Sequence, residues 1–354
     1  MNDPQLISPS QPGGAQQAQP LRDWIRRRPL FAFFLLTFAF SWLVWLLPIF
    51  VRITDPVAFR QLNTIGAFGP ALAGLLVQSL LHPNPHPAPW QKRMEAFSLA
   101  FLAAGALYFI CLPYASSQPF AASILGWILR ILLFLAAALV ISSVLTGHEP
   151  LRRMLLPVGP RTHPAWYAAA LLVYPVLLLV GLGLSAGFGQ AIQFSLPEGG
   201  GLLLAVRVVT SFVYIFLFGG PLNEEPGWRG FALPRMQRSL SPLAATLILG
   251  AAWGIWHFPM HLNGFYPSAG PSSLPAELAL RVLSTLLVAF LYTWFFNKTK
   301  GNVLVCTLLH ASFNTASAFI SGSPLTMLLL GVLALVLILE SRQWIKLPPA
   351  PDPA

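Results

Sequence analysis

Two adjacent glutamates begin a short polar segment that follows a long apolar stretch. Glu224 and Glu225 precede Arg229, and Glu225 is spaced from Arg229 as i, i+4. This spacing favours a salt bridge on one face of a helix. Such a pair can hold one carboxylate in place and leave the other, Glu224, free to activate a water molecule.

A histidine is expected at the same depth as these glutamates. Glu224 lies 16 residues before Leu240, and His257 lies 16 residues after Ser241. If two antiparallel helices meet at Leu240–Ser241, both side chains lie about 24 Å from the turn, at ~1.5 Å of rise per residue. A carboxylate and an imidazole at one level can activate water, either directly or through a metal ion.

A second histidine is paired with an amide further along the chain. His310 and Asn314 are spaced i, i+4, so both lie on one face of a helix. Two such hydrogen-bond donors suit the stabilisation of an oxyanion. Together, the carboxylate, the two imidazoles and the amide could hydrolyse an amide bond.

Each group also has a non-catalytic explanation. Two glutamates beside an apolar span can be an interfacial charge cluster, and a His–Asn pair can bond neighbouring helices. A metal site is left open, with Glu224, His257 and His310 as candidate ligands and zinc as a candidate ion. His257 and His261 have the spacing of a helical metal pair, but Pro259 lies between them, and the HExxH motif is absent.

The elements that must position these residues are membrane-spanning helices. The chain is 56% hydrophobic and 9% charged, against ~25% charged residues in ordinary soluble domains. Its apolar runs are continuous and many reach the ~20 residues that cross a bilayer as a helix. They are too long for barrel strands and lack the alternation of apolar and polar residues that such strands show. The sequence therefore predicts an all-α fold. About ten spans are expected, at Leu30–Val51, Gln61–Leu81, Ala96–Ser117, Phe120–Thr146, Ala165–Phe188, Gly201–Pro221, Leu240–Phe258, Leu274–Phe296, Asn302–Ile320 and Leu325–Leu339.

The net charge of +10 is explained by membrane topology, without nucleic acid as a partner. In a ten-span arrangement 15 of the 21 basic residues fall on one side, and the opposite side holds Arg52 and Arg60. The positive-inside rule then puts both termini in the cytoplasm. Among charges within the spans, Glu277 and Arg281 are spaced i, i+4 and are expected to pair. Arg130 has no explanation from the sequence.

The chain divides by composition and hydropathy. We expect a disordered tail at 1–20, helices 1–5 at 21–200, catalytic helices 6–10 at 201–342 and a C-terminal tail at 343–354. Cys111 and Cys306 both fall in apolar spans, so no disulfide is expected.

The three motifs together resemble those of the CPBP family of intramembrane peptidases, which includes Rce1-like CAAX prenyl proteases and Abi proteins. EEPGWR at 224–229 is similar to EExxxR, WGIWH at 253–257 is similar to FxxxH with Trp253 in place of phenylalanine, and His310 with Asn314 is similar to HxxxN. The resemblance covers about 203–320.

The resemblance implies a role for each motif residue. Glu224 and His257 would activate the water, Glu225 and Arg229 would orient the site, and Trp253 would form a wall of the substrate pocket. His310 and Asn314 would bind the oxyanion, and His310 could instead join a metal. The implied substrate is a membrane-associated peptide or lipoprotein, CAAX-type tails included. The expected location is a bacterial inner (plasma) membrane, with the active site on the cytoplasmic side.

The residue types in the spans exclude other classes of intramembrane protease. The spans contain no aspartate, so an aspartyl intramembrane protease is excluded, and the missing HExxH and GxSx elements exclude site-2 zinc and rhomboid-like types. The alternative to a peptidase is a non-catalytic membrane scaffold or immunity-type protein that binds a partner peptide with the same residues.

Overall fold

The computed structural model describes residues 19–115, 123–156, 161–190 and 200–348. Within these ranges all of the regular elements are helices and there is no strand, which confirms the all-α prediction. The tail predicted to be disordered at 1–20 lies almost wholly outside the described residues. The elements are α1 (Gln19–Arg27), α2 (Pro29–Phe50), α3 (Pro56–Gly66), α4 (Gly69–Leu81), α5 (Trp90–Ala115), α6 (Ile124–Thr146), α7 (Glu149–Arg152), α8 (Pro164–Gly187), α9 (Gly200–Phe218), α10 (Pro221–Gly227), the π-helix η1 (Trp228–Ala232), α11 (Leu233–Met236), α12 (Pro242–Trp256), α13 (Phe258–Leu262), α14 (Leu274–Lys298), α15 (Val303–Phe319) and α16 (Pro324–Glu340).

Most of these helices are built to cross a membrane. Eight segments of the described chain are long and apolar enough to span a bilayer, and two shorter apolar helices, α15 and α16, follow them. Together they match the ten predicted spans within a few residues at most boundaries. The second span, Pro56–Leu81, is two helices, because the chain turns at Ala67–Phe68 between α3 and α4.

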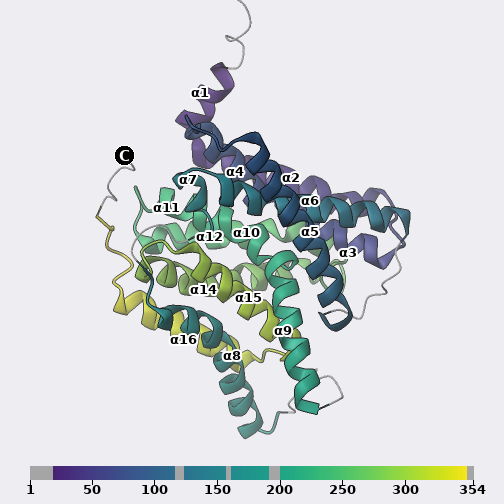
Figure 1. Ribbon diagram of the computed structural model, residues 1–354. Helices are drawn as coiled ribbons and strands as arrows, with labels where there is room; N and C mark the ends of the chain where they lie inside the picture. Colours follow the sequence, from purple (N-terminus) through teal and green to yellow (C-terminus); the bar gives the residue numbers. More distant parts are fainter. Residues whose placement is uncertain (1–18, 116–122, 157–160, 191–199, 349–354) are drawn as a thin grey trace, which may run out of the picture.

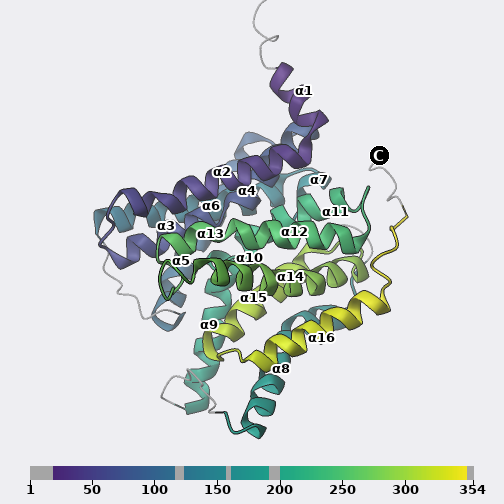
Figure 2. The same cartoon turned by 180° about the vertical axis from the view of Figure 1, so that it is seen from behind.

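The helices that carry the predicted motifs pack closely in the middle of the molecule. In Figures 1 and 2, α10 lies at the centre, and α2, α12, α14 and α16 run across the molecule one above another. The α12–α14 contact depends on small residues: the space a side chain would need at Gly250 or Gly254 is already taken by α14, where Leu286 and Val282 lie. Small residues are how membrane helices approach this closely.

The chain is broken directly before the Glu-Glu pair. α9 ends at Phe218, Gly220 has a φ of +116°, and the short helix α10 then begins at Pro221. α10 continues into the π-helix η1, a distortion that is frequent at functional sites. Non-helical backbone at membrane depth is tolerated where it is buried in protein or lines a cavity. The break between α9 and α10 therefore indicates a buried or cavity-lining backbone at the point where α10 begins.

The two ends of the helical bundle differ in charge. The basic residues grouped in the sequence flank the starts of α2, α5 and α8 and the ends of α11, α14 and α16. The loop at 263–273, between α13 and α14, lies at the other end, together with the link between α2 and α3. Whether the basic end faces the cytoplasm stays a prediction.

Arg130 is fully buried in α6 among aromatic rings. Its guanidinium carbon lies 4.7 Å from the centre of the Trp127 ring and 5.6 Å from that of Tyr108. These cation–π contacts give the residue a structural setting that the sequence did not suggest.

Candidate active site

A cavity of about 210 Å³ lies where α10, α12, α14 and α15 meet. Glu224, Trp253, His257, His310 and Asn314 all line it. These are five of the seven predicted site residues, and they come from three separate helices. The other two, Glu225 and Arg229, are buried and do not line the cavity.

Glu224 reaches the cavity from the short helix α10. It is 5% exposed, and its Oε2 accepts a hydrogen bond of 2.7 Å from the indole Nε1–H of Trp253. This bond fixes the carboxylate, because it occupies one of the two oxygens. The other oxygen, Oε1, lies next to the backbone of Gly220.

Three polar atoms converge on the space beside Gly220. A Cβ atom on this residue would lie 2.9 Å from Glu224 Oε1, 3.2 Å from His310 Nε2 and 3.3 Å from Asn314 Nδ2. A glycine is required here for two reasons, since the φ of +116° also disfavours any other residue. The point beside Gly220 is therefore within hydrogen-bonding reach of an acid, an imidazole and an amide at once.

Glu225 is fully buried and joins two other predicted residues. Its Oε1 accepts from Arg229 Nη1 at 3.1 Å and lies 2.8 Å from His310 Nδ1. Arg229 in turn lies between two rings, 4.6 Å from the centre of Trp253 and 4.4 Å from that of Tyr292. The i, i+4 salt bridge predicted for Glu225 and Arg229 is confirmed.

The two histidines are held so that one ring nitrogen of each is already bonded. His310 Nδ1 faces a carboxylate oxygen, and His257 Nδ1 lies 2.8 Å from the carbonyl oxygen of Trp253. Because a carbonyl and an ionised carboxylate only accept, each Nδ1 carries the proton. In the neutral ring Nε2 is then an acceptor, and it becomes a donor only when the ring is protonated.

Asn314 lines the same cavity from α15. Its Nδ2 donates to the carbonyl oxygen of Gly219 at 2.8 Å. An amide nitrogen carries two N–H groups, so one remains for a ligand beside Gly220.

The candidate metal ligands do not form a recognisable metal site. Among the described residues no group of three or more His, Cys, Asp or Glu side chains is arranged to hold a metal ion. His261 points elsewhere, with its Nδ1 3.4 Å from Glu277 Oε2.

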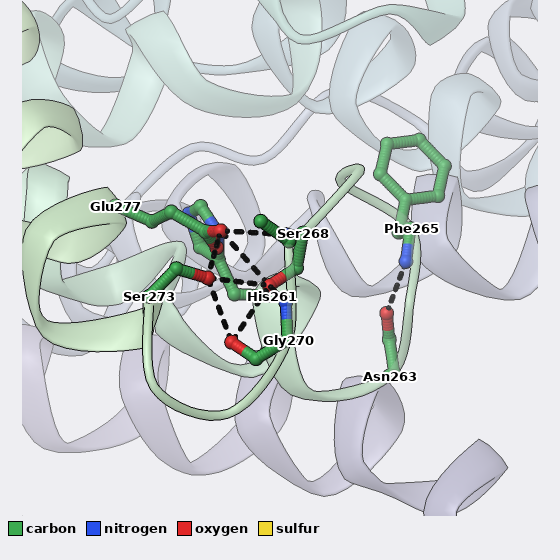
Figure 3. Close-up of polar contacts among 8 residues, drawn as sticks. His261, Asn263, Phe265, Ser268, Gly270, Ser273 and Glu277 are labelled. Carbon is green, nitrogen blue, oxygen red and sulfur yellow. Dashed lines mark hydrogen bonds and ion pairs between the residues drawn. The ribbon is translucent and has the colours of Figure 1, made fainter.

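The predicted ion pair between Glu277 and Arg281 is wrong. Glu277 faces the loop at 263–273, where its Oε1 accepts from the hydroxyls of Ser268 and Ser273 and from the backbone N–H of Ala269 (Figure 3). The three donors of this loop bind the Glu277 carboxylate in place of Arg281, which lies one turn further along α14. Helical spacing alone did not reveal the loop.

Several residues outside the motifs complete the cavity. Trp45 from α2 and Asn63 from α3 line it on one side, and Tyr266 and Arg281 line it on another. The Trp45 ring stacks on His257 with centroids 6.4 Å apart. The sequence did not indicate Trp45, Asn63 or Tyr266, because none of them has a diagnostic spacing from the motifs.

Two comparisons with known proteins bear on this site. Residues 206–316 match the family model described as type II CAAX prenyl endopeptidase Rce1-like. The chain is also 29% identical over 148 residues to CAAX prenyl protease 2 of Methanococcus maripaludis. That alignment covers 40% of this chain and 52% of the relative, so this chain spans about half the length of the relative that it matches. The resemblance drawn from the three motifs is confirmed.

Proposed function

We propose that this chain is an intramembrane endopeptidase that hydrolyses a peptide bond in a membrane-associated substrate. The observation that carries the proposal is the convergence of Glu224 Oε1, His310 Nε2 and Asn314 Nδ2 beside Gly220. The match of residues 206–316 to the Rce1-like family model supports it, as does the similarity to a CAAX prenyl protease.

The reaction begins with a water molecule between Glu224 and His257. Glu224 Oε1 accepts one proton of the water, and the Nε2 lone pair of His257 accepts the hydrogen bond from the other. The water oxygen attacks the carbonyl carbon of the peptide bond. Glu224 then passes its proton to the leaving nitrogen as the C–N bond breaks, which releases an amine and a carboxyl product.

The negative charge that develops on the carbonyl oxygen needs donors. The free N–H of Asn314 supplies one, and Nε2–H of His310 supplies another when the ring is protonated. Glu225 orients this ring, since its carboxylate oxygen lies 2.8 Å from His310 Nδ1. Glu225 and Arg229 thus act by positioning and charge, without touching the substrate.

Metal dependence is a separate proposal. The sequence offers Glu224, His257 and His310 as candidate ligands and zinc as the candidate ion. A divalent metal would polarise the substrate carbonyl or the water. Assays with and without a chelator distinguish this from a glutamate-activated water.

The chain is an integral multi-pass protein, and its orientation in a bacterial inner membrane is proposed from charge. We place both termini in the cytoplasm, because the basic residues gather at one end of the bundle. The cavity extends toward the other end, where Phe265 and Tyr266 of the 263–273 loop line it. We therefore propose access from the face opposite the basic loops, in place of the cytoplasmic access expected from the sequence.

The decisive experiment is proteolysis of a peptide library, with CAAX-type tails included, by purified wild type and Glu224→Ala. We expect cleavage by the wild type and none by the variant, with both proteins unfolding at the same temperature. Equal cleavage by the two would overturn the proposal. Full biological activity in the variant would instead support the non-catalytic scaffold or immunity-type role.

A further inference from the structure

Four basic side chains meet at the basic end of the bundle, and none of them lines the cavity described above. This basic cluster consists of His82 directly after α4, His148 directly before α7, Arg235 in α11 and Arg238 just after α11. Figures 1 and 2 both show α4, α7 and α11 side by side. Because like charges repel one another, their convergence requires an explanation.

The members of the basic cluster are close enough for their charges to interact. Partial burial lowers the pKa of His82. The positive charges of Arg235, His148 and Arg238 lower it further. Burial also lowers the pKa of Arg235 to about 10, and the charge of Arg238 adds to this effect. The folded chain therefore holds these groups together against their mutual repulsion.

No acidic side chain compensates the basic cluster within the described residues. Neither Arg235 nor Arg238 forms an ion pair there. Glu149, the acid next to His148 in the sequence, is paired with Arg153 instead. The positive-inside rule explains why basic residues lie on one side of a membrane protein, but not why four of them converge. An anion from outside the chain would supply the missing negative charge.

Two members of the basic cluster have hydrogen-bond donors available for such an anion. Arg235 is held in place, because its Nη1 donates to the Phe231 carbonyl oxygen at 2.9 Å and its Nη2 donates to Gln78 Oε1. Each of these nitrogens carries a second N–H group. Both ring nitrogens of His148 are buried and have no hydrogen-bond partner among the described residues. An imidazole always has at least one N–H, so His148 holds a buried donor without an acceptor.

The place of the basic cluster in the fold indicates which anion it binds. His82 directly follows the membrane span that ends at Leu81, and His148 follows the span that ends at Thr146. Both histidines therefore lie where helices leave the hydrocarbon, at the level of the lipid headgroups. Leu145, in the last turn of α6, is 56% exposed and can contact an acyl chain. Basic pockets between membrane-spanning helices bind the headgroups of anionic lipids.

We propose that the basic cluster binds the phosphate group of an anionic phospholipid and thereby holds α11 against α4. The planar guanidinium of Arg235 presents N–H groups that fit phosphate oxygens, and His148 adds a further donor. Because α11 continues from α10 and η1, which carry Glu224 and Arg229, the lipid also fixes the far end of that segment. Lipid binding at this site is independent of the peptidase chemistry.

The test titrates the purified protein with dioctanoyl phosphatidylglycerol, in a neutral maltoside detergent at constant ionic strength. A ligand that binds the folded protein raises its unfolding temperature with concentration, which gives an apparent Kd. We expect a clear rise with phosphatidylglycerol and a smaller one with dioctanoyl phosphatidylcholine, because the choline group is positively charged. Equal rises with the two lipids would contradict the proposal. Sodium phosphate is the third ligand, and a rise as large with phosphate alone would overturn the lipid as its source.

Two double variants locate the binding. Arg235→Gln/Arg238→Gln removes both guanidinium groups, and each basic side chain near an anionic lipid contributes about fivefold to affinity. We therefore expect the Kd for phosphatidylglycerol to rise by about 30-fold. His82→Gln/Arg238→Gln changes only exposed side chains and keeps the contacts of Arg235, so it reports on the site even if the first variant does not fold. We expect it to weaken binding by about fivefold or more, and an unchanged Kd in this variant would overturn the proposal.

Arg161→Gln/Lys300→Gln is the matched control, because it removes two positive charges from the same end of the bundle and leaves the basic cluster intact. Both side chains are exposed, and the hydrogen bond from Asn302 to Thr162 places them near the start of α15. We expect the wild-type Kd. A loss as large as that of the cluster variants would show that general charge attraction causes the binding, and would contradict a defined site.

Discussion

The indole N–H of Trp253 donates to Glu224 Oε2 at 2.7 Å, which links the second motif to the first. In the FxxxH pattern that this segment resembles, phenylalanine has no such donor. The same tryptophan also supplies the carbonyl that holds His257 Nδ1 and one face of the stack around Arg229. One residue therefore positions the proposed base, its partner imidazole and the supporting arginine.

Trp253→Phe keeps the aromatic wall and removes the hydrogen bond to Glu224. A hydrogen bond to a charged group contributes about 1.5–3 kcal/mol, so we expect kcat to fall by ~10- to 100-fold. Steady-state kinetics on a library-derived peptide measures this. An unchanged kcat would mean that Glu224 is held in place without the indole.

Gly220→Ala should abolish activity. The added Cβ would lie 2.9 Å from Glu224 Oε1 and would occupy the space between Glu224, His310 and Asn314, at a backbone φ of +116°. Gly201→Ala is a suitable control, because a Cβ there meets nothing within 4 Å. Retained cleavage by Gly220→Ala would show that the reaction takes place elsewhere.

Asn314→Ala removes a proposed oxyanion donor. Loss of one such donor typically lowers kcat by about 10²–10³. Asn314 also bonds the Gly219 carbonyl, so the thermal unfolding temperature is measured in parallel. A higher KM with an unchanged kcat would contradict the oxyanion role, because it would show that Asn314 contributes only to substrate binding.

The Glu225–Arg229 pair should matter more for stability than Glu224 does. Removing one partner of a buried ion pair leaves an uncompensated charge and typically destabilises by about 3–5 kcal/mol. We expect Arg229→Met to lower the unfolding temperature in detergent clearly, and Glu224→Gln to leave it near that of the wild type. The double variant Glu225→Gln/Arg229→Met should recover part of the loss, because no unpaired charge remains.

Thiol labelling tests the orientation. Both native cysteines are buried, so a cysteine introduced at the exposed Ala269 or Arg238 reports the side of each loop. In intact cells we expect a membrane-impermeant maleimide to label Ala269→Cys and not Arg238→Cys. The opposite pattern would reverse the topology and return the cavity to the cytoplasmic side.

The sequence predicted the features that depend on local spacing and composition. The apolar runs identified the spans, since the hydrocarbon imposes their length. The i, i+4 rule identified the bond between Glu225 and Arg229, and the antiparallel hairpin argument put Glu224 and His257 in one cavity. It failed for Glu277 and Arg281, because the competing donors come from a loop whose path depends on tertiary contacts. Trp45 and Tyr266 were missed for the same reason.

The site depends on both halves of the chain. The Trp42 Nε1–H donates to the carbonyl of Trp256, and Asn263 donates to that of Trp45. A fragment restricted to the matched stretch 206–316 would leave one flank of His257 against detergent or lipid. An exchange of catalytic segments between relatives should therefore include α2 and α3. Without them, the transferred motifs would lack Trp45 and Asn63, which line the cavity.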